Sequence, residues 1–201
     1  MKLLQKIMTG FAAFMVIIYI AGFFLDDEVS LTRNILIEAP REQVFELVAD
    51  FNNWNAWSPW NAFDPDAIYD VTGMDRGQRM VWASDHPAIG EGAQTVVFYE
   101  PPRMIETRLD LGGWGDGYGA FVLIENEKTD STRIYWQYNG EMRRGKPFLL
   151  KPVHTYYGLF MDEMLAPTYE RGLQQLKELA ERQDLSAAMA DAELEEALPP
   201  Q

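Results

Sequence analysis

Apolar and polar residues alternate in short runs through the middle of the chain. Between residues 67 and 139, turns rich in Gly, Pro and Asp separate six such runs, at 68–72, 79–84, 94–99, 104–111, 118–126 and 132–139. A period of two is typical of β-strands, and this regular spacing indicates an antiparallel meander. In the last run Ile134, Trp136 and Tyr138 share one side, so the sheet is predicted to bury one face and expose the other.

Elements of other kinds flank the meander. Residues 29–38 are mostly aliphatic and β-branched, which predicts a first strand. After Ala39-Pro40, residues 41–50 place apolar side chains at helical spacing, and the Trp-rich stretch that follows predicts a second short helical turn. At the other end, residues 155–183 form a long amphipathic pattern that predicts a helix, with a kink or break at Pro167.

The chain begins with an apolar run of membrane-spanning length. Residues 7–25 carry no charge, and about 19 residues at about 1.5 Å each nearly match a hydrocarbon core of about 30 Å. Lys2 and Lys6 precede the run, and acidic residues 26–28 follow it. The positive-inside bias therefore predicts a single-pass protein of the cytoplasmic (inner) membrane, with its N-terminus in the cytoplasm and its domain outside.

Two other interpretations of the apolar run stay open. A cleaved signal peptide has a similar pattern, but a cut after Ala21 or Gly22 puts Tyr19 or Ile20 where a small residue is wanted. A buried core helix of this length normally carries a polar face. We interpret residues 1–28 as an uncleaved anchor with its flanks, 29–183 as one domain, and 184–201 as an acidic, flexible tail.

Composition and charge exclude several kinds of partner and site. The 201 residues carry a net charge of −14 and show no basic stripe, so nucleic acid is not expected as a partner. The chain has no cysteine, which excludes disulfides, thiolate catalysis and iron–sulfur clusters. Its two histidines, His86 and His154, are far apart in sequence, so we expect neither a metal site nor a cofactor.

The chain's basic cluster lies in residues 140–152. It consists of Arg143, Arg144, Lys146 and Lys151, with three large apolar residues between Lys146 and Lys151. Such a cluster could guide an acidic amphiphile or touch lipid headgroups, and a solvated loop is the alternative.

Several motifs resemble one bacterial family. They are ILIEAPREQVFELVADFNNWNAWSPW at 35–60, Gly90-Glu91-Gly92, Pro101-Pro102 before Met104-Ile105-Glu106, and TYERGLQQLKELAE at 168–181. Together with the order of elements, they resemble the polyketide cyclase/dehydrase-like family of the START-like (SRPBCC) superfamily over about residues 30–182. The resemblance implies an α+β helix-grip fold: a seven-stranded curved antiparallel sheet around a long C-terminal helix, with one or two short helices after the first strand. It also implies a cavity for apolar ligands, and it brings no invariant catalytic set.

The large aromatic and Met side chains of these elements are the candidate ligand-binding residues. They are Trp57, Trp60, Trp82, Trp114, Trp136, Tyr138, Met161 and Met164. Such side chains also form ordinary hydrophobic cores. We predict no catalytic residue, because Asp64 and Asp66 are typical of a turn before a strand and His154 of a helix entry.

The leading hypothesis is a membrane-anchored protein that binds a hydrophobic small molecule, such as a lipid, an isoprenoid or a polyketide-like compound. The membrane contact would be made by the N-terminal helix. One alternative is a cyclase-like enzyme whose cavity folds its substrate, with proximity supplying most of the rate and a carboxylate or histidine moving protons. The other is a non-catalytic interaction domain with a filled core.

Overall fold

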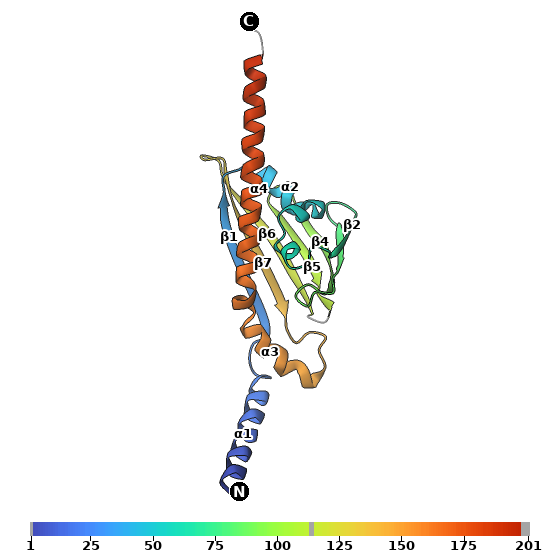
Figure 1. Ribbon diagram of the computed structural model, residues 1–201, viewed down its shortest axis with the longest axis vertical. Helices are drawn as coiled ribbons and strands as arrows, with labels where there is room; N and C mark the ends of the chain where they lie inside the picture. Colours follow the sequence, from blue (N-terminus) through green and yellow to red (C-terminus); the bar gives the residue numbers. More distant parts are fainter. Residues whose placement is uncertain (1, 113–114, 198–201) are drawn as a thin grey trace.

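Seven antiparallel strands form one sheet in the order β1-β7-β6-β5-β4-β3-β2. The structure, a computed structural model, describes the backbone of residues 2–112 and 115–197 and side chains as far as residue 186. Strand β1 pairs with β7, and the others follow one another as a meander (Figure 1). The strands are β1 (Glu28–Ile37), β2 (Ile68–Thr72), β3 (Arg79–Ala83), β4 (Glu91–Glu100), β5 (Met104–Asp110), β6 (Asp116–Asn126) and β7 (Ser131–Glu141).

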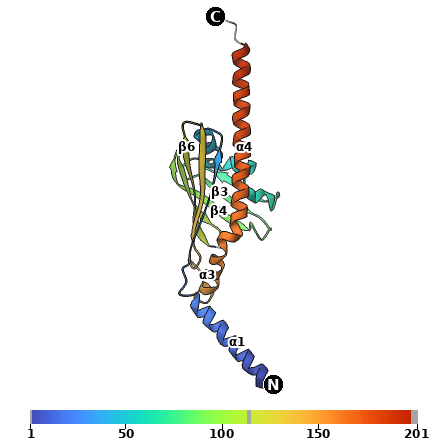
Figure 2. The same ribbon diagram turned by 90° about the vertical axis from the view of Figure 1, so that its left-hand side faces the viewer.

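Helices precede the sheet, interrupt it after β1 and close the chain. They are α1 (Lys2–Ala21), α2 (Arg41–Ala49), η1 (Phe51–Ala56), η2 (Pro59–Ala62), η4 (Phe148–Leu150), α3 (Lys151–Leu159) and α4 (Met161–Ala197). Helix α4 runs along one face of the sheet, called here the inner face (Figures 1 and 2). This arrangement confirms the predicted helix-grip fold.

The core lies between the inner face, α2 and α4. Leu173 and Leu176 of α4 are 2 % and 0 % exposed, and Val44 and Val48 of α2 are both 0 % exposed. Spacings of three and four residues put each pair on one helical face, so both helices bury an apolar stripe. Arg33 also points from β1 toward α4, where it pairs with acidic side chains at 3.0 and 3.3 Å.

The last helix has no break at Pro167, and a kink at that residue stays a prediction. Helix α3 ends at Leu159 and α4 begins at Met161, whereas Pro167 lies inside α4. Helix α3 packs closely just before the break: a Cβ on Gly158 would lie 2.8 Å from Met142 and 3.0 Å from Val29. The chain turns at Phe160, and α4 then follows the sheet. Helix α4 also continues beyond residue 183, and the division of a tail there stays a prediction.

Helix α1 projects from the end of the domain where α3 lies (Figures 1 and 2). None of its described residues is buried. Among the described helices it is the one long and apolar enough to cross a membrane, as judged by length and composition. Its exposure contradicts the alternative of a buried core helix, and a signal sequence would pass the same test of length and composition.

Candidate functional site

Five aromatic rings fill the part of the inner face that α4 and η1 cover. Trp136 of β7 stacks on Tyr169 of α4 and on Phe121 of β6, with ring centroids 4.1 and 5.1 Å apart. The indoles of Trp54 and Trp57 pack against the same rings, and each donates its N–H to a carbonyl of α2, at 3.0 and 2.9 Å. None of the five residues is more than 6 % exposed. This part of the interior is packed, and burial raises the pKa of Tyr169.

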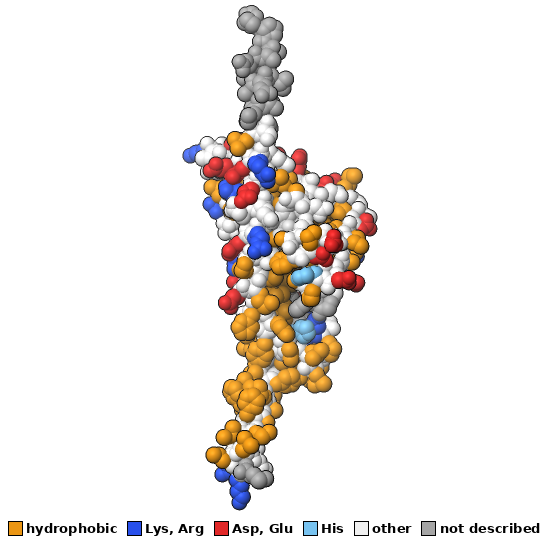
Figure 3. All heavy atoms as spheres, viewed as in Figure 1, with side chains coloured by type: hydrophobic (Ala, Val, Ile, Leu, Met, Phe, Trp, Pro, Cys, Tyr) orange, Lys and Arg blue, Asp and Glu red, His pale blue; other side chains and the backbone are white. Residues whose placement is uncertain are grey.

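A second group of side chains packs on this core but stays partly exposed. We call it the open wall, and its members are Trp60, Tyr69, Trp82, Leu109, Leu111, Met161 and Leu165. They come from η2, β2, β3, the end of β5 and the residue after it, and the start of α4. Figure 3 shows apolar side chains gathered in the lower half of the domain and continuing onto α1. The open wall is therefore a solvent-accessible part of the apolar inner face.

Glycines bring two aromatic rings of this region close to the backbone of neighbouring strands. A Cβ on Gly92 of β4 would collide with the ring of Trp82, and one on Gly117 of β6 would lie 2.7 Å from the Tyr138 ring. The absence of side chains at these positions therefore gives both rings room to lie directly on the backbone of the neighbouring strand.

Two polar groups near the open wall have no hydrogen-bond partner among the described residues. They are the amide nitrogen of Gln94 on β4 and the hydroxyl of Tyr69 on β2. Gln94 is 3 % exposed and lies opposite Leu109, while Tyr69 lies opposite Trp82. Burial, and next the charge of Asp64, raises the pKa of Tyr69, so its hydroxyl keeps its proton at neutral pH. Both groups can donate a hydrogen bond to a molecule held at the inner face.

The predicted ligand-binding residues occupy different environments. Trp57 and Trp136 belong to the packed aromatic cluster, and Tyr138 is 5 % exposed on the inner face. Three others, Trp60, Trp82 and Met161, belong to the open wall. Met164 is 59 % exposed, and Trp114 lies outside the described residues.

As ligand contacts, sequence reasoning missed Gln94, Leu109, Leu111 and Leu165, and it associated Tyr69 with the acidic residues 64–66 and not with the apolar surface. The alternation of Leu109 and Leu111 along the fifth strand was an available signal for the two leucines. Nothing in the local sequence predicts that the Gln94 amide lacks a hydrogen-bond partner, because this depends on the side chains of the neighbouring strands.

The acid–base candidates have ordinary structural roles. The Asp64 carboxylate accepts hydrogen bonds from the Ser84 hydroxyl at 2.5 Å and the Asp66 backbone N–H at 3.0 Å. The Ser84 hydrogen bond lowers the pKa of Asp64, which suits a turn and not a proton donor. Burial, and next the positive charge of Lys146, lowers the pKa of His154 on α3. Within the described residues no group of three or more His, Asp or Glu is placed to hold a metal ion.

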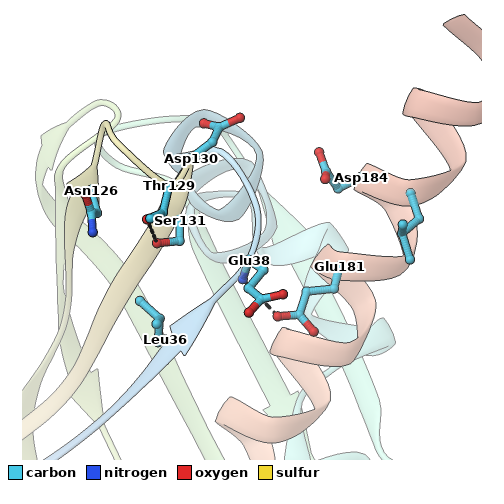
Figure 4. A pocket seen from close by; sticks show the side chains of 9 residues that line it. Leu36, Glu38, Asn126, Thr129, Asp130, Ser131, Glu181 and Asp184 are labelled. Atoms are coloured by element: carbon cyan, nitrogen blue, oxygen red, sulfur yellow. Dashed lines mark hydrogen bonds between the residues drawn. The ribbon is translucent and has the colours of Figure 1, made fainter. Parts of the chain in front are cut away.

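A polar hollow lies at the far end of the sheet from α1. It encloses about 590 Å³ between the 126–131 turn, the end of β1 and α4 (Figure 4). Four carboxylates line it, and one of them, Glu181, accepts the backbone N–H of Glu38 at 2.8 Å. Its lining residues are Leu36, Glu38, Asn126, Thr129, Asp130, Ser131, Glu181, Asp184 and Leu185. This acidic lining is unsuited to an apolar ligand, and the candidate site is the open wall on account of its apolar side chains.

Solved structures share the fold at low sequence identity. The ZhuI aromatase/cyclase of Streptomyces sp. R1128 is 15 % identical, with a TM-score of 0.55 over 77 % of this chain and 94 % of that one. A protein of Nitrosospira multiformis is 17 % identical, with a TM-score of 0.52 over 75 % and 95 %. The di-domain aromatase/cyclase StfQ of the steffimycin pathway is 10 % identical, with a TM-score of 0.54 over 78 % and 51 %. No curated protein matches the sequence.

A family match covers the sheet and most of the described length of α4. The sequence profile described as "Polyketide cyclase / dehydrase and lipid transport" matches residues 28–181. The matched segment begins with β1 and ends within α4, so it includes the inner face, the open wall and the aromatic cluster. The chain therefore belongs to the polyketide cyclase/dehydrase and lipid transport family.

Proposed function

We propose that this protein binds a hydrophobic small molecule at the open wall, between the inner face of the sheet and the start of α4. The observation that carries the proposal is the pair of unpartnered donors, Gln94 and Tyr69, in an apolar surround. A buried polar group without a partner costs about 1–3 kcal/mol, so a folded protein gains by satisfying it. A ligand with an apolar body and a hydrogen-bond acceptor, such as a carbonyl oxygen, supplies the missing partner.

In this proposal Trp60, Trp82 and Met161 contact the ligand from the partly exposed rim. Tyr138 forms the floor, and the aromatic cluster with Trp57 and Trp136 limits the depth of the site. Trp114 and Met164 are proposed as outer ligand contacts because the sequence pattern places them near the site. The binding unit is residues 29–183, with 184–201 as its tail.

Gln94→Leu tests the role of the amide. The substitution removes an unpaired buried donor at similar volume, so the ligand-free protein should gain about 1–3 kcal/mol in free energy of unfolding. Affinity for 2-acetylnaphthalene should fall about tenfold, because the ketone loses one hydrogen bond. Affinity for 2-ethylnaphthalene, which has the same carbon skeleton and no oxygen, should be unchanged. Urea unfolding and the quenching of Trp emission measure the two effects.

Gln137→Leu is the matched control. This substitution makes the same chemical change on β7. Gln137 is half-buried and lies between Trp136 and Tyr138, whose side chains face inward. It should leave the affinity for the ketone unchanged. If Gln94→Leu also leaves that affinity unchanged, or if it destabilises the ligand-free domain, the amide is not a ligand donor and the proposal loses its main support.

We further propose that α1 is an uncleaved membrane anchor with the domain outside the cytoplasm. The charge asymmetry around α1 supports this orientation. Direct contacts between the end of α1 and α3 support retention of the helix: the Tyr19 hydroxyl donates to the Leu149 carbonyl at 2.7 Å, and the Tyr156 hydroxyl to the Ile18 carbonyl at 2.6 Å. Cleavage after Ala21 would remove both contacts.

Alkaline phosphatase fused after Gln201 should be active in intact cells, because the enzyme folds only outside the cytoplasm. The same fusion without residues 2–21 should be inactive. Membrane fractionation should recover the active fusion with the membrane. A soluble exported form that begins near Phe23 would instead show that the helix is a cleaved signal sequence.

A cyclase activity is the second candidate. It is favoured by the aromatase/cyclases among the proteins of the same fold. In this reading the open wall folds a polyketide-like chain and proximity supplies most of the rate. Turnover of such a chain by the purified protein, at a rate that Trp82→Ala reduces, would favour the enzyme over the binding protein.

A further inference from the structure

Exposed apolar side chains are concentrated in η4, α3 and the turn after them. We call residues 148–160 the interfacial segment. Its large apolar residues are 42 % to 70 % exposed: Phe148, Leu149, Leu150, Val153, Tyr157, Leu159 and Phe160. Soluble surfaces rarely gather so many apolar groups in one short stretch, so a partner is expected to cover them.

The interfacial segment contacts the last turn of α1 and the residues that follow it, and we call this contact region the joint. The Phe23 ring stacks on Phe148 with centroids 4.9 Å apart. A Cβ on Gly22 would lie 2.8 Å from Pro152 and 2.9 Å from Tyr156, so the two elements approach closely there. Arg143 adds hydrogen bonds to the carbonyls of Phe23 and Leu25, at 2.9 and 3.0 Å. The segment is therefore held beside the C-terminal end of α1.

The length of α1 sets the depth at which this contact region lies in the membrane. Its 20 residues at about 1.5 Å each span about 30 Å, the thickness of a hydrocarbon core, with the Lys2 and Lys6 side chains extending to the cytoplasmic headgroups. A helix that spans the bilayer then brings its last turn to the membrane–water boundary. The phenols of Tyr19 and Tyr156 lie in the joint, and tyrosine is enriched at that boundary. The exposed apolar side chains of the segment are at the same level.

The charge around the segment also suits a phospholipid surface. Residues 142–161 contain four basic residues and no acidic one, in a chain of net charge −14. On the face that Figure 3 shows, the acidic side chains lie on the upper part of the domain. Acidic residues 26–28 follow α1 directly, and Asp27 pairs with Arg143 at 2.7 Å. An apolar face flanked by Lys and Arg is typical of segments that lie in the interface plane.

We propose that the interfacial segment lies in the outer leaflet of the membrane that α1 spans, at the boundary between headgroups and acyl chains. Met161 and Leu165 of the open wall lie in the first turns of α4, just after the segment, and in this proposal the site opens toward the leaflet. A hydrophobic ligand then enters from the bilayer without crossing water. This inference rests on the proposed anchor and on the proposed ligand site.

Single cysteines can report the depth of each element, because the natural chain has none. Leu149→Cys and Val153→Cys lie in the segment. The hydrogen bond between Leu149 and Tyr19 uses the Leu149 backbone carbonyl, so the substitution keeps it. Two matched controls replace residues that are both 55 % exposed: Ile124→Cys near the far end of the sheet and Phe14→Cys in α1. Each full-length variant is labelled with NBD and reconstituted into vesicles of phosphatidylethanolamine and phosphatidylglycerol, with and without doxyl-labelled phospholipid.

Labels at Leu149 and Val153 should show blue-shifted emission and at least about threefold more quenching by doxyl lipid than the label at Ile124. Quenching at either position no greater than at Ile124 overturns the proposal and leaves the surface to a protein partner. In that case the label at Phe14 tests whether α1 is inserted in the membrane. If Phe14 is quenched, the anchor stands without the interfacial contact, and if it is not, the anchor fails as well. Binding of 2-acetylnaphthalene to the same variants is measured separately, so failure of the ligand site is recognised independently.

Discussion

Replacing Leu173 with aspartate should destabilise the domain by about 3–5 kcal/mol, because it buries an unpaired carboxylate. Leu173 is 2 % exposed and lies on the stripe of α4 that faces the sheet. Total stabilities of domains are about 5–15 kcal/mol, so this loss removes much or all of the folded state. Urea unfolding of the full-length protein in detergent, followed by Trp fluorescence, measures the change.

Gln174→Asp is the control for this substitution. It places the same new charge one residue further on, at an exposed position. The expected cost is only about 0.5 kcal/mol, from lost hydrogen bonding to Glu178 and repulsion between the two carboxylates. Similar stabilities for the two variants would mean that α4 does not close the core.

Trp136→Ala should have the next largest effect, a loss of about 3–5 kcal/mol in the free energy of unfolding. The ring is in contact with Tyr169, Phe121, Trp54 and Trp57, and its removal leaves a cavity that a packed cluster cannot refill. Trp82→Ala should cost less, about 1–2 kcal/mol, because the Trp82 ring is partly exposed and was never fully removed from water.

Ligand binding should rank the same two variants in the opposite order. Trp82→Ala removes a side chain of the open wall. We therefore expect this variant to bind 2-acetylnaphthalene more weakly than the folded molecules of the Trp136→Ala variant do. Both affinities are measured by titrating the folded protein with the ligand in the absence of urea. A larger loss of affinity for Trp136→Ala would place the ligand inside the aromatic cluster and would contradict the assignment of the open wall.

The sequence by itself determined the elements and the faces they bury. Strand alternation is a local property, so the predicted strand at 68–72 coincides with β2, and Ile134, Trp136 and Tyr138 all lie on the inner face. The charge-free run predicted α1 for the same reason, because length and hydropathy are read along the chain. The motifs at 35–60 and 168–181 were sufficient for the family.

Only the tertiary structure decided which predicted residues form core and which form the open wall. Trp136 and Trp82 follow the same strand pattern, but α4 and η1 cover the first and leave the second partly exposed. A bulge between Val96 and Phe98 also changes which residues of β4 face inward, and simple alternation cannot anticipate it. These outcomes, like the isolation of the Gln94 amide and the joint between α1 and α3, depend on contacts between residues far apart in sequence. A local pattern carries no information on such contacts, because its period specifies a face and not what covers it.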